Sequence, residues 1–443
     1  MLMNNSPNGK ENQYRKSDTI DYPKKYFSFV DKVEILNNDD YEVHLESVKV
    51  DDYEKIVENP DAIGEMITYN LVSQVSQKKM LGLFGRLEDI DGTWFKIDLT
   101  NIANNNSVAV YEDAYGINQT NSLYISYIDN ITKADNETNK SLSSTFSLKN
   151  IPDAKKEDIV NALNIHTGKG LSLNVYDVGQ GSMTAICRDN VFPLVYIDMG
   201  GGCYNNAHTY RSFLRHCTTK NPLTILTHWD ADHIWTAHHN YTSISNTTWI
   251  VPRQNLSPLQ LKFLKRLINN NNRILVFPSS LSRIDTVLCT IVKCTGPTLN
   301  KNESGIAVYV PVDDKVGNFK ALLPGDASYK CISHLSDNDL SIGGIMATHH
   351  GANFKESNSP IPTANHPYRI IYQYGLGNTY GHARPESVKA HYNNGWGNIM
   401  VTTNGNISFN TVETAIDTPC SSVNCDLKIN KSFHYPPYRI SIL

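Results

Sequence analysis

Apolar and polar residues alternate in short runs over the first third of the chain, and this period of two is typical of half-buried strands. The clearest runs lie at 27–30, 41–45, 108–111 and 123–128. Two further runs, 81–85 and 94–99, flank Asp91-Gly92, which predicts a hairpin. We therefore expect residues 23–130 to form a small N-terminal α+β or β-rich module of unknown role, preceded by a disordered tail over 1–22.

A period closer to that of a helix follows Asn59-Pro60 in this module, since apolar residues recur there at three- and four-residue spacing. They are Ile63, Met66, Ile67, Leu71 and Val75. Asn59 as cap and Pro60 at the first helical position predict where this helix begins. From 131 to 165 the composition shifts to Asn, Thr, Ser and Lys, which predicts a linker with a short helix from Asp153 to Leu163.

From Leu171 onward, apolar runs of strand length alternate with helical patterns, which favours a layered α/β domain over residues 166–443. A helix is expected near 206–217, and Ser257-Pro258 predicts the start of another. The expected strands lie at 173–178, 184–187, 194–198, 222–226, 273–277, 287–292, 305–311 and 319–323.

The composition places the chain among folded proteins with more than one domain. Its 443 residues are 40% hydrophobic and 19% charged, enough for packed cores. A net charge of -4 gives no global attraction to nucleic acid, although it does not exclude such a substrate. Apolar runs long enough for a signal peptide or a membrane span are lacking, so we expect a cytoplasmic protein without membrane contact. The eight cysteines are expected to be free thiols, and the Cys420–Cys425 pair is a weak indication of a bridge or metal site.

The densest chemistry follows the apolar run 222–226. His228, Asp230, Asp232 and His233 place four potential metal ligands within six residues, directly after a predicted strand. Open α/β sheets bind ligands beyond the carboxyl ends of their strands. The alternative is that Asp232 only caps a helix that begins at His233. Carboxylates this close repel each other unless a cation lies between them, so the pattern favours a metal site.

Three later apolar runs also end in ligand-type residues. Asp326 follows 321–325, His349 and His350 follow 345–348, and His382 ends 380–382. Carboxylates and imidazoles together suit hard or borderline divalent cations. A carboxylate such as Asp326 can bridge two ions, and paired ions are a recurring arrangement for displacement at phosphorus or carbonyl centres.

Seven stretches of the chain between Leu171 and Phe409 carry a resemblance to a known family. They are Asp177-Val178-Gly179-Gln180-Gly181, Ile197-Asp198-Met199-Gly200-Gly201, His228 to His233, Asn302 to Gly305, Leu323-Pro324-Gly325-Asp326, His349-His350-Gly351 and Asn378-Thr379-Tyr380-Gly381-His382. In this order they resemble the metallo-β-lactamase superfamily, and specifically the hydrolase domain of ComEC-type DNA-uptake proteins. The first 165 residues lie outside the resemblance. Ser182 and Ala383-Arg384-Pro385 depart from that branch, in which an acidic residue and His-Pro are usual.

The resemblance implies a four-layer αββα sandwich and assigns roles to individual residues. His228 and Asp230 would hold a first ion, Asp232 and His233 a second, Asp326 would bridge them, and His349 would complete the second ion's shell. Supporting residues would be Asp198, His350 and Asp177. His382 would orient or protonate the leaving oxygen, and the candidate substrate contacts are Arg384 and Asn378.

The function that follows is a metal-dependent hydrolase, a phosphodiesterase or nuclease that uses a hydroxide activated by two divalent ions. Asp232 would be both ligand and partner for the water's proton, and the ions would be zinc or manganese, with magnesium possible. One alternative is hydrolysis of a non-nucleotide ester, thioester or lactone. Another is a partner-binding or toxin-type module, in which the N-terminal domain recognises a protein and the metallo-domain is secondary. The substrate, the metal and the oligomeric state stay open.

Overall fold

The computed structural model describes residues 24–36, 40–86, 90–112, 122–164, 171–188, 192–210, 216–240, 244–314, 317–337, 340–354, 360–362, 368–404 and 407–408. The chain divides between Asn139 and Lys140 into two compact units, which we describe separately as the N-terminal and C-terminal units. Both mix strands and helices, so the expected α/β class is confirmed. The division falls inside the predicted linker, but two helices occupy much of that segment, α3 (Asn136–Thr145) and α4 (Lys156–Asn164).

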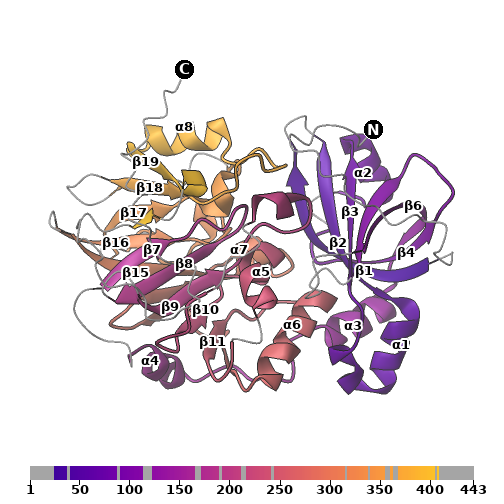
Figure 1. Ribbon diagram of the computed structural model, residues 1–443, viewed down its shortest axis with the longest axis horizontal. Coiled ribbons are helices and arrows are strands. Elements are labelled where there is room, and N and C mark those ends of the chain that lie inside the picture. The colour runs from indigo at the N-terminus through magenta and orange to yellow at the C-terminus, as the bar shows by residue number, and fades with distance from the viewer. Residues whose placement is uncertain are drawn as a thin grey trace. The chain divides into compact units, whose positions relative to one another are not determined.

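The N-terminal unit is a closed antiparallel barrel in the order β1-β2-β3-β5-β6-β4 (Figure 1). Its strands are β1 (Lys24–Ile35), β2 (Tyr41–Lys49), β3 (Tyr69–Val75), β4 (Trp94–Thr100), β5 (Ser107–Glu112) and β6 (Ser122–Lys133). Alternate residues such as Val43, Leu45 and Leu71 fill its core, as the period of two predicts. Two short helices accompany it, α1 (Val50–Glu58) and α2 (Gln77–Leu83), and Met80 of α2 packs on that core.

Two local predictions in this unit are wrong. Asn59 does cap Pro60, but only a 3-10 turn, η2 (Pro60–Gly64), follows, and the rest of the expected helix is strand β3. The apolar residues of that segment fit a strand because it is buried on both faces, from Tyr69 to Ser73. The run 81–85 ends helix α2 and is not a hairpin strand, since β4 pairs with β1 and β6.

The C-terminal unit contains two seven-stranded sheets, in the orders β12-β11-β10-β9-β8-β7-β20 and β13-β14-β15-β16-β17-β18-β19. The first comprises β7 (Leu171–Val175), β8 (Met183–Arg188), β9 (Phe192–Met199), β10 (Leu223–Ile225), β11 (Thr248–Val251), β12 (Arg273–Val276) and β20 (Ile407–Ser408). The second comprises β13 (Arg283–Asp285), β14 (Thr290–Lys293), β15 (Ile306–Asp314), β16 (Gly317–Leu323), β17 (Ile342–Met346), β18 (Arg369–Tyr372) and β19 (Asn398–Val401). Strands β9 to β12 are parallel to one another, and so are β16 to β19.

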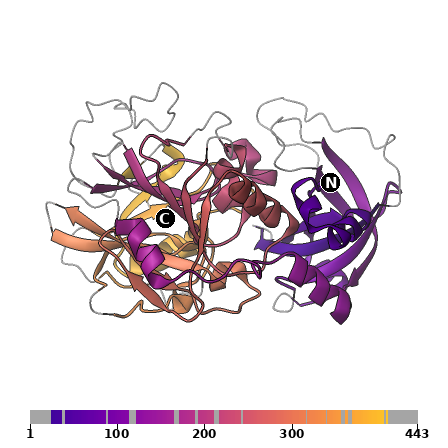
Figure 2. The ribbon, with the colours of Figure 1, turned by 90° about the horizontal axis from the view of Figure 1, so that it is seen from below.

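An apolar core lies between these two sheets, and both contribute to it through residues such as Ile197, Ile250 and Val308. Trp249 precedes Ile250 and therefore points to the outer face of the first sheet, where Phe263 of α6 (Pro258–Asn269) packs against its ring at a centroid distance of 5.7 Å. Helix α5 (Ala231–His239) contacts β9 of the same sheet. The second sheet is covered on its outer side by α8 (Pro385–Asn393), whose Val388 packs against Ile345 and Ile370 of that sheet. Helix α8 is labelled in Figure 1, and Figure 2 shows the ribbon turned by 90°.

Several smaller expectations can be compared with this unit. Ser257 caps α6 in a reciprocal capping box, as predicted. Near 206–217 the chain forms a 3-10 turn, η4 (Tyr204–Thr209), and residues 211–215 lie outside the described part. The six cysteines of the described part are buried and form no disulfide within it, whereas Cys420 and Cys425 lie outside it. Among the described residues, no helix is both long and apolar enough to cross a membrane.

Candidate metal centre

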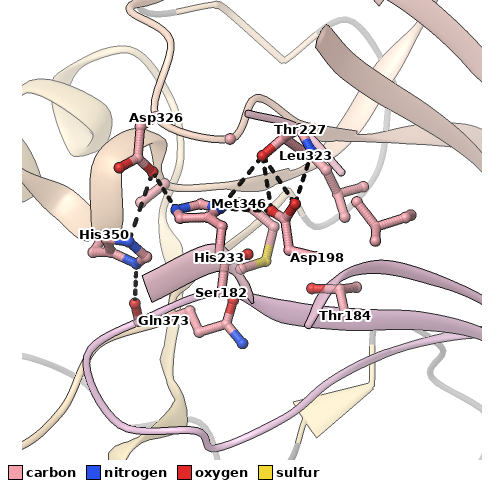
Figure 3. A pocket seen from close by; sticks show the side chains of 13 residues that line it. Ser182, Thr184, Asp198, Thr227, His233, Leu323, Asp326, Met346, His350 and Gln373 are labelled. Carbon is pink, nitrogen blue, oxygen red and sulfur yellow. Dashed lines mark hydrogen bonds and ion pairs between the residues drawn. The ribbon is translucent and has the colours of Figure 1, made fainter. Parts of the chain in front are cut away.

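The predicted ligands meet where the strands of both sheets end. Asp198 lies near the end of β9, His228 and His233 follow β10, Asp326 follows β16, and His350 follows β17. Strands β9 and β10 are parallel neighbours in the first sheet, and β16 and β17 are parallel neighbours in the second. The carboxyl ends of each pair therefore lie at the same edge of their sheet. Figure 3 shows Asp198, His233, Asp326 and His350 around one pocket. The fold therefore brings together residues that are about 150 positions apart.

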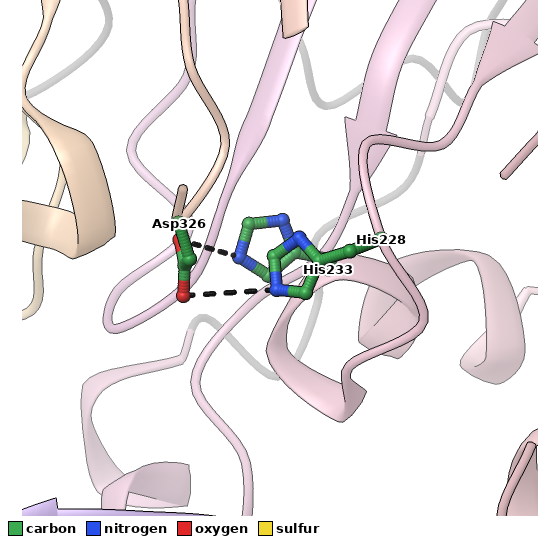
Figure 4. Close-up of side chains that lie close together, drawn as sticks. All are labelled: His228, His233 and Asp326. Carbon is green, nitrogen blue, oxygen red and sulfur yellow. Dashed lines mark ion pairs between the residues drawn. The ribbon is translucent and has the colours of Figure 1, made fainter. Parts of the chain in front are cut away.

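Asp326 lies at the middle of this cluster, and each of its carboxylate oxygens faces a different pair of imidazoles. Oδ1 is 3.1 Å from Nε2 of His233 and 3.6 Å from Nε2 of His350. Oδ2 is 3.7 Å from Nε2 of His228 and 3.5 Å from Nε2 of His349. Figure 4 shows the carboxylate facing the His228 and His233 rings. This is the arrangement expected of a carboxylate that bridges two cations.

The other two carboxylates fall on opposite sides of Asp326. Oδ2 of Asp230 is 3.4 Å from Nε2 of His228, and Oδ2 of Asp232 is 3.4 Å from Nε2 of His350. Two groups of three residues have ligand atoms that all lie within 4.8 Å of one another inside the group. One group is His228, His233 and Asp326, and the other is Asp232, His233 and His350. The predicted set is thus assembled as two overlapping groups.

The two adjacent histidines of this set lie on different sides of Asp326. His350, expected only as a supporting residue, shares a group with Asp232 and His233, whereas His349 lies on the Oδ2 side of Asp326, with His228. The reason is the backbone, because His349, His350 and Gly351 all have positive φ, of 47°, 56° and 88°. The resulting tight turn points the two adjacent side chains to different sides of Asp326. His350 is buried, and His349 keeps 20% of its side chain exposed.

Two ligand rings are oriented by a network around Asp198. Its Oδ2 accepts a hydrogen bond from Nδ1 of His233 at 2.8 Å. The Thr227 hydroxyl donates to the same carboxylate at 2.9 Å and lies 3.1 Å from Nδ1 of His228. With Nδ1 as donor in both rings, Nε2 is the ring atom left to bind a cation, and it faces Asp326. Asp198 therefore has the supporting contact predicted for it, whereas Thr227 was missed because a threonine after a strand carries no distinctive signal.

His350 is oriented in the same way by the end of β18. Its Nδ1 donates to the backbone carbonyl of Gln373 at 2.9 Å, which leaves the lone pair on Nε2. The Gln373 amide in turn donates to the carbonyl groups of Tyr176 and Met183, at 2.7 and 2.8 Å, and so links β18 to the first sheet. Sequence reasoning could not find Gln373, because its role depends on main-chain contacts.

The ligand atoms of the cluster are buried and largely without hydrogen bonds among the described residues. Those without a hydrogen-bond partner are Nε2 of His228, His233 and His350, Oδ2 of Asp326 and both carboxylate oxygens of Asp230. Burying polar atoms unpaired is costly, and buried charges in proteins are usually paired or coordinate metals. The donor set of imidazole nitrogen and carboxylate oxygen therefore fits divalent cations.

The charges in this centre partly offset one another. Burial alone would raise the pKa of Asp326, but His349, His233 and His350 hold it well below its usual range. Burial alone would lower the pKa of His233, but Asp326 and Asp198 raise it well above its usual range. A further basic group, Lys301, donates to the Trp229 carbonyl at 3.0 Å and lies 3.4 Å from Oδ1 of Asp230. Burial lowers the pKa of Lys301 well below its usual range.

The glycine-rich stretches of the motif set hold the backbone of Asp232. The carbonyl oxygen of Asp232 accepts hydrogen bonds from the amides of Gly201 at 2.9 Å and Ser182 at 3.1 Å. A Cβ at Gly200 would lie 1.7 Å from that oxygen, and one at Gly181 would lie 2.6 Å from it. These two positions therefore require glycine. Ser182, a departure from the related branch, supports the ligand through its main chain, which any residue except proline provides.

His382 lies at the side of the histidine cluster and is only 5% exposed. Its ring centroid is 5.7 Å from that of His349 and 6.4 Å from that of His350. The Gln180 amide nitrogen is 3.1 Å from Nδ1 of His382. Asn378, a predicted substrate contact, bonds to both the amide and the carbonyl group of His382, at 2.9 and 2.6 Å. These bonds indicate that Asn378 positions the loop.

Two predicted residues remain, Asp177 and Arg384. Asp177 is 8% exposed, and its Oδ1 accepts from the Gly179 amide at 3.4 Å. Arg384 precedes α8, and its backbone amide donates to the Gly351 carbonyl at 2.9 Å. Its predicted contact with substrate stays a prediction. No protein-family model and no curated protein matches this chain, so the resemblance to the metallo-β-lactamase superfamily rests on the motif residues themselves.

Proposed function

We propose that the C-terminal unit is a metal-dependent hydrolase, and specifically a phosphodiesterase or nuclease, built on the αββα sandwich of the metallo-β-lactamase superfamily. Two facing sheets with an apolar core between them and helices on their outer faces support this assignment of fold. The observation that carries the functional proposal is the position of Asp326, whose two oxygens face two sets of buried imidazoles. A simple structural ion pair does not need four imidazoles around one carboxylate.

Two divalent ions would be held by the two sets. One set comprises His228, Asp230, His349 and Oδ2 of Asp326, and the other comprises Asp232, His233, His350 and Oδ1 of Asp326. Such ions polarise the attacked group, lower the pKa of water towards neutrality and neutralise developing charge. Zinc or manganese suits this mixture of nitrogen and oxygen ligands better than magnesium, which prefers oxygen.

The residues of the chain supply position and proton transfer. The backbone of Asp232 is fixed by two loops and its Oδ2 lies 3.4 Å from Nε2 of His350, so that its carboxylate can accept the proton of an attacking water. His382 lies beside His349 and His350, within reach of a group that is bound between the two sets. Burial of the centre excludes bulk water and strengthens these electrostatic interactions.

The test is hydrolysis by the full chain loaded with manganese or zinc. Bis-p-nitrophenyl phosphate and labelled single- and double-stranded nucleic acids are compared with a lactone and a thioester. We expect turnover of the phosphodiesters that is lost in Asp326→Ala. Lactone or thioester cleavage without phosphodiester cleavage would instead identify a non-nucleotide hydrolase. Fewer than one bound ion per chain after loading would favour a partner-binding module.

A further inference from the structure

Gln180 and His382 form a buried contact between two distant parts of the chain. Gln180 lies in the loop between β7 and β8, and His382 precedes α8, 202 residues later. The Gln180 amide nitrogen is 3.1 Å from Nδ1 of His382, and the two residues are 1% and 5% exposed. At this distance and burial the hydrogen bond between them is a fixed part of the centre.

The direction of this hydrogen bond determines where the His382 proton lies. A glutamine amide nitrogen donates and cannot accept, so Nδ1 of His382 must be the acceptor. A neutral imidazole carries one N–H, which is then on Nε2. His233 and His350 have the opposite arrangement, since their Nδ1 atoms donate to Asp198 and to the Gln373 carbonyl. The centre therefore contains two histidines whose Nδ1 donates and one, His382, whose Nδ1 accepts.

We propose that Gln180 is a positioning residue that holds His382 neutral with its proton on Nε2, so that His382 donates a hydrogen bond to an oxygen of the attacked group. The inference rests on the proposed hydrolase function and refines it. A neutral imidazole that gave up its only N–H proton would become an imidazolate, which is a strong base, so outright donation of this proton is unfavourable. His382 therefore stabilises charge on the substrate by a hydrogen bond and does not protonate the leaving oxygen.

The surroundings of both residues restrict their movement. The backbone amide of Gln180 donates to the Thr209 hydroxyl at 2.9 Å, and a Cβ at the neighbouring Gly179 would lie 2.4 Å from the Thr209 carbonyl oxygen. Asn378 holds the backbone of His382 on both sides. Because neither loop can withdraw easily, the amide stays directed at Nδ1. This rigidity is the property that a preorganised hydrogen-bond donor requires.

The tautomer can be measured directly by nitrogen NMR on metal-free protein labelled with ¹⁵N-histidine, with the His382 signals assigned from their loss in His382→Gln. We expect a protonated Nε2 and an unprotonated Nδ1 in the wild type. In Gln180→Glu a carboxylate takes the place of the amide and can only accept, so the proton should move to Nδ1. A protonated Nδ1 in the wild type, or an unchanged tautomer in Gln180→Glu, would overturn the proposal. This readout needs no turnover, so it is independent of the proposed hydrolase activity.

Kinetics on the loaded protein then separate hydrogen bonding from proton donation. Gln180→Glu and Gln180→Met should lower kcat by about 10²-fold, the usual effect of losing one preorganised donor, with KM little changed. The fold-loss should be equal for p-nitrophenyl and phenyl phosphodiesters. A loss that grows with the pKa of the leaving group would show protonation and refute the proposed role. Gln260→Met, which removes a buried glutamine from the α6 cap, is the matched control and should leave kcat and the His382 tautomer unchanged.

Discussion

Replacing Asp198 by asparagine tests whether the hydrogen bonds behind the ligands support metal binding. The Asp198 carboxylate accepts from Nδ1 of His233 at 2.8 Å, from the Thr227 amide at 2.8 Å and from the Thr227 hydroxyl at 2.9 and 3.0 Å. Asparagine has the same shape but keeps one acceptor oxygen and replaces the other with an NH₂ donor. The three donors cannot all be satisfied, so either His233 or Thr227 loses its acceptor.

The expected loss follows from the position of His233 in the centre. If an NH₂ group faces Nδ1, the His233 ring must rotate or move its proton to Nε2, and in both cases the lone pair directed at Asp326 is lost. Mutation of such supporting partners costs roughly 10–100-fold in metal affinity. His233 belongs to both groups of close ligand atoms, so we expect a loss near 100-fold, or about 2.7 kcal/mol.

The assay is calorimetric titration of metal-free Asp198→Asn with zinc and with manganese, beside the wild type. Asp153→Asn is the matched control, because the Asp153 carboxylate also accepts several hydrogen bonds, from Arg253 and Ser279, and none of its recorded contacts is with the ligand cluster. The control should bind the ions with wild-type affinity. Equal affinities for Asp198→Asn and the wild type, with both proteins folded, would refute the supporting role of Asp198.

Three other outcomes are expected. His349→Ala and His350→Ala should each weaken the binding of one of the two ions. Metal analysis after zinc loading measures this, and loss of both ions from either variant would contradict separate sites. Gly200→Ala should destabilise the fold and reduce metal content together, because its Cβ would lie 1.7 Å from the Asp232 carbonyl oxygen; wild-type thermal stability would contradict this. Burial lowers the pKa of His391 to about 4 in the folded chain, compared with about 6.5 in the unfolded chain. The unfolded chain therefore binds a proton at His391 more readily, and the free energy of unfolding falls as the pH drops from about 6.5 towards 4. Between pH 7 and pH 5 the wild type should lose about 2 kcal/mol more than His391→Gln in urea unfolding, and equal losses would argue against this linkage.

The gathering of these His and Asp residues could be predicted from the sequence because they directly follow apolar runs, and the ions that they are proposed to hold stay a prediction. Its details could not, and the adjacent His349 and His350 show why. The two side chains lie on different sides of Asp326 because three successive residues have positive φ angles. The residue types alone do not predict this backbone conformation. Thr227 and Gln373 act through contacts that only the folded chain creates.

The errors in the barrel have a different origin. The apolar spacing from Ile63 to Val75 fits a helix as well as a strand that is buried on both faces, and only pairing with β2 and β5 selects the strand. The run 81–85 is equally ambiguous, because its local pattern does not show that it ends a helix whose Met80 packs on the barrel core. Short apolar runs of this kind therefore acquire their structure from tertiary contacts.

The hold on Asp232 by Gly200, Gly201 and Ser182 has a consequence for ion selectivity. If Asp232 binds an ion as proposed, its fixed main chain limits how far the carboxylate can shift for ions of different radius. Calcium requires six to eight oxygen ligands in a flexible shell at 2.3–2.6 Å, whereas zinc accepts four ligands at about 2.0–2.2 Å from nitrogen or oxygen. A rigid Asp232 therefore favours small ions that tolerate few ligands, and the centre should discriminate against calcium by size as well as by the nature of its ligands.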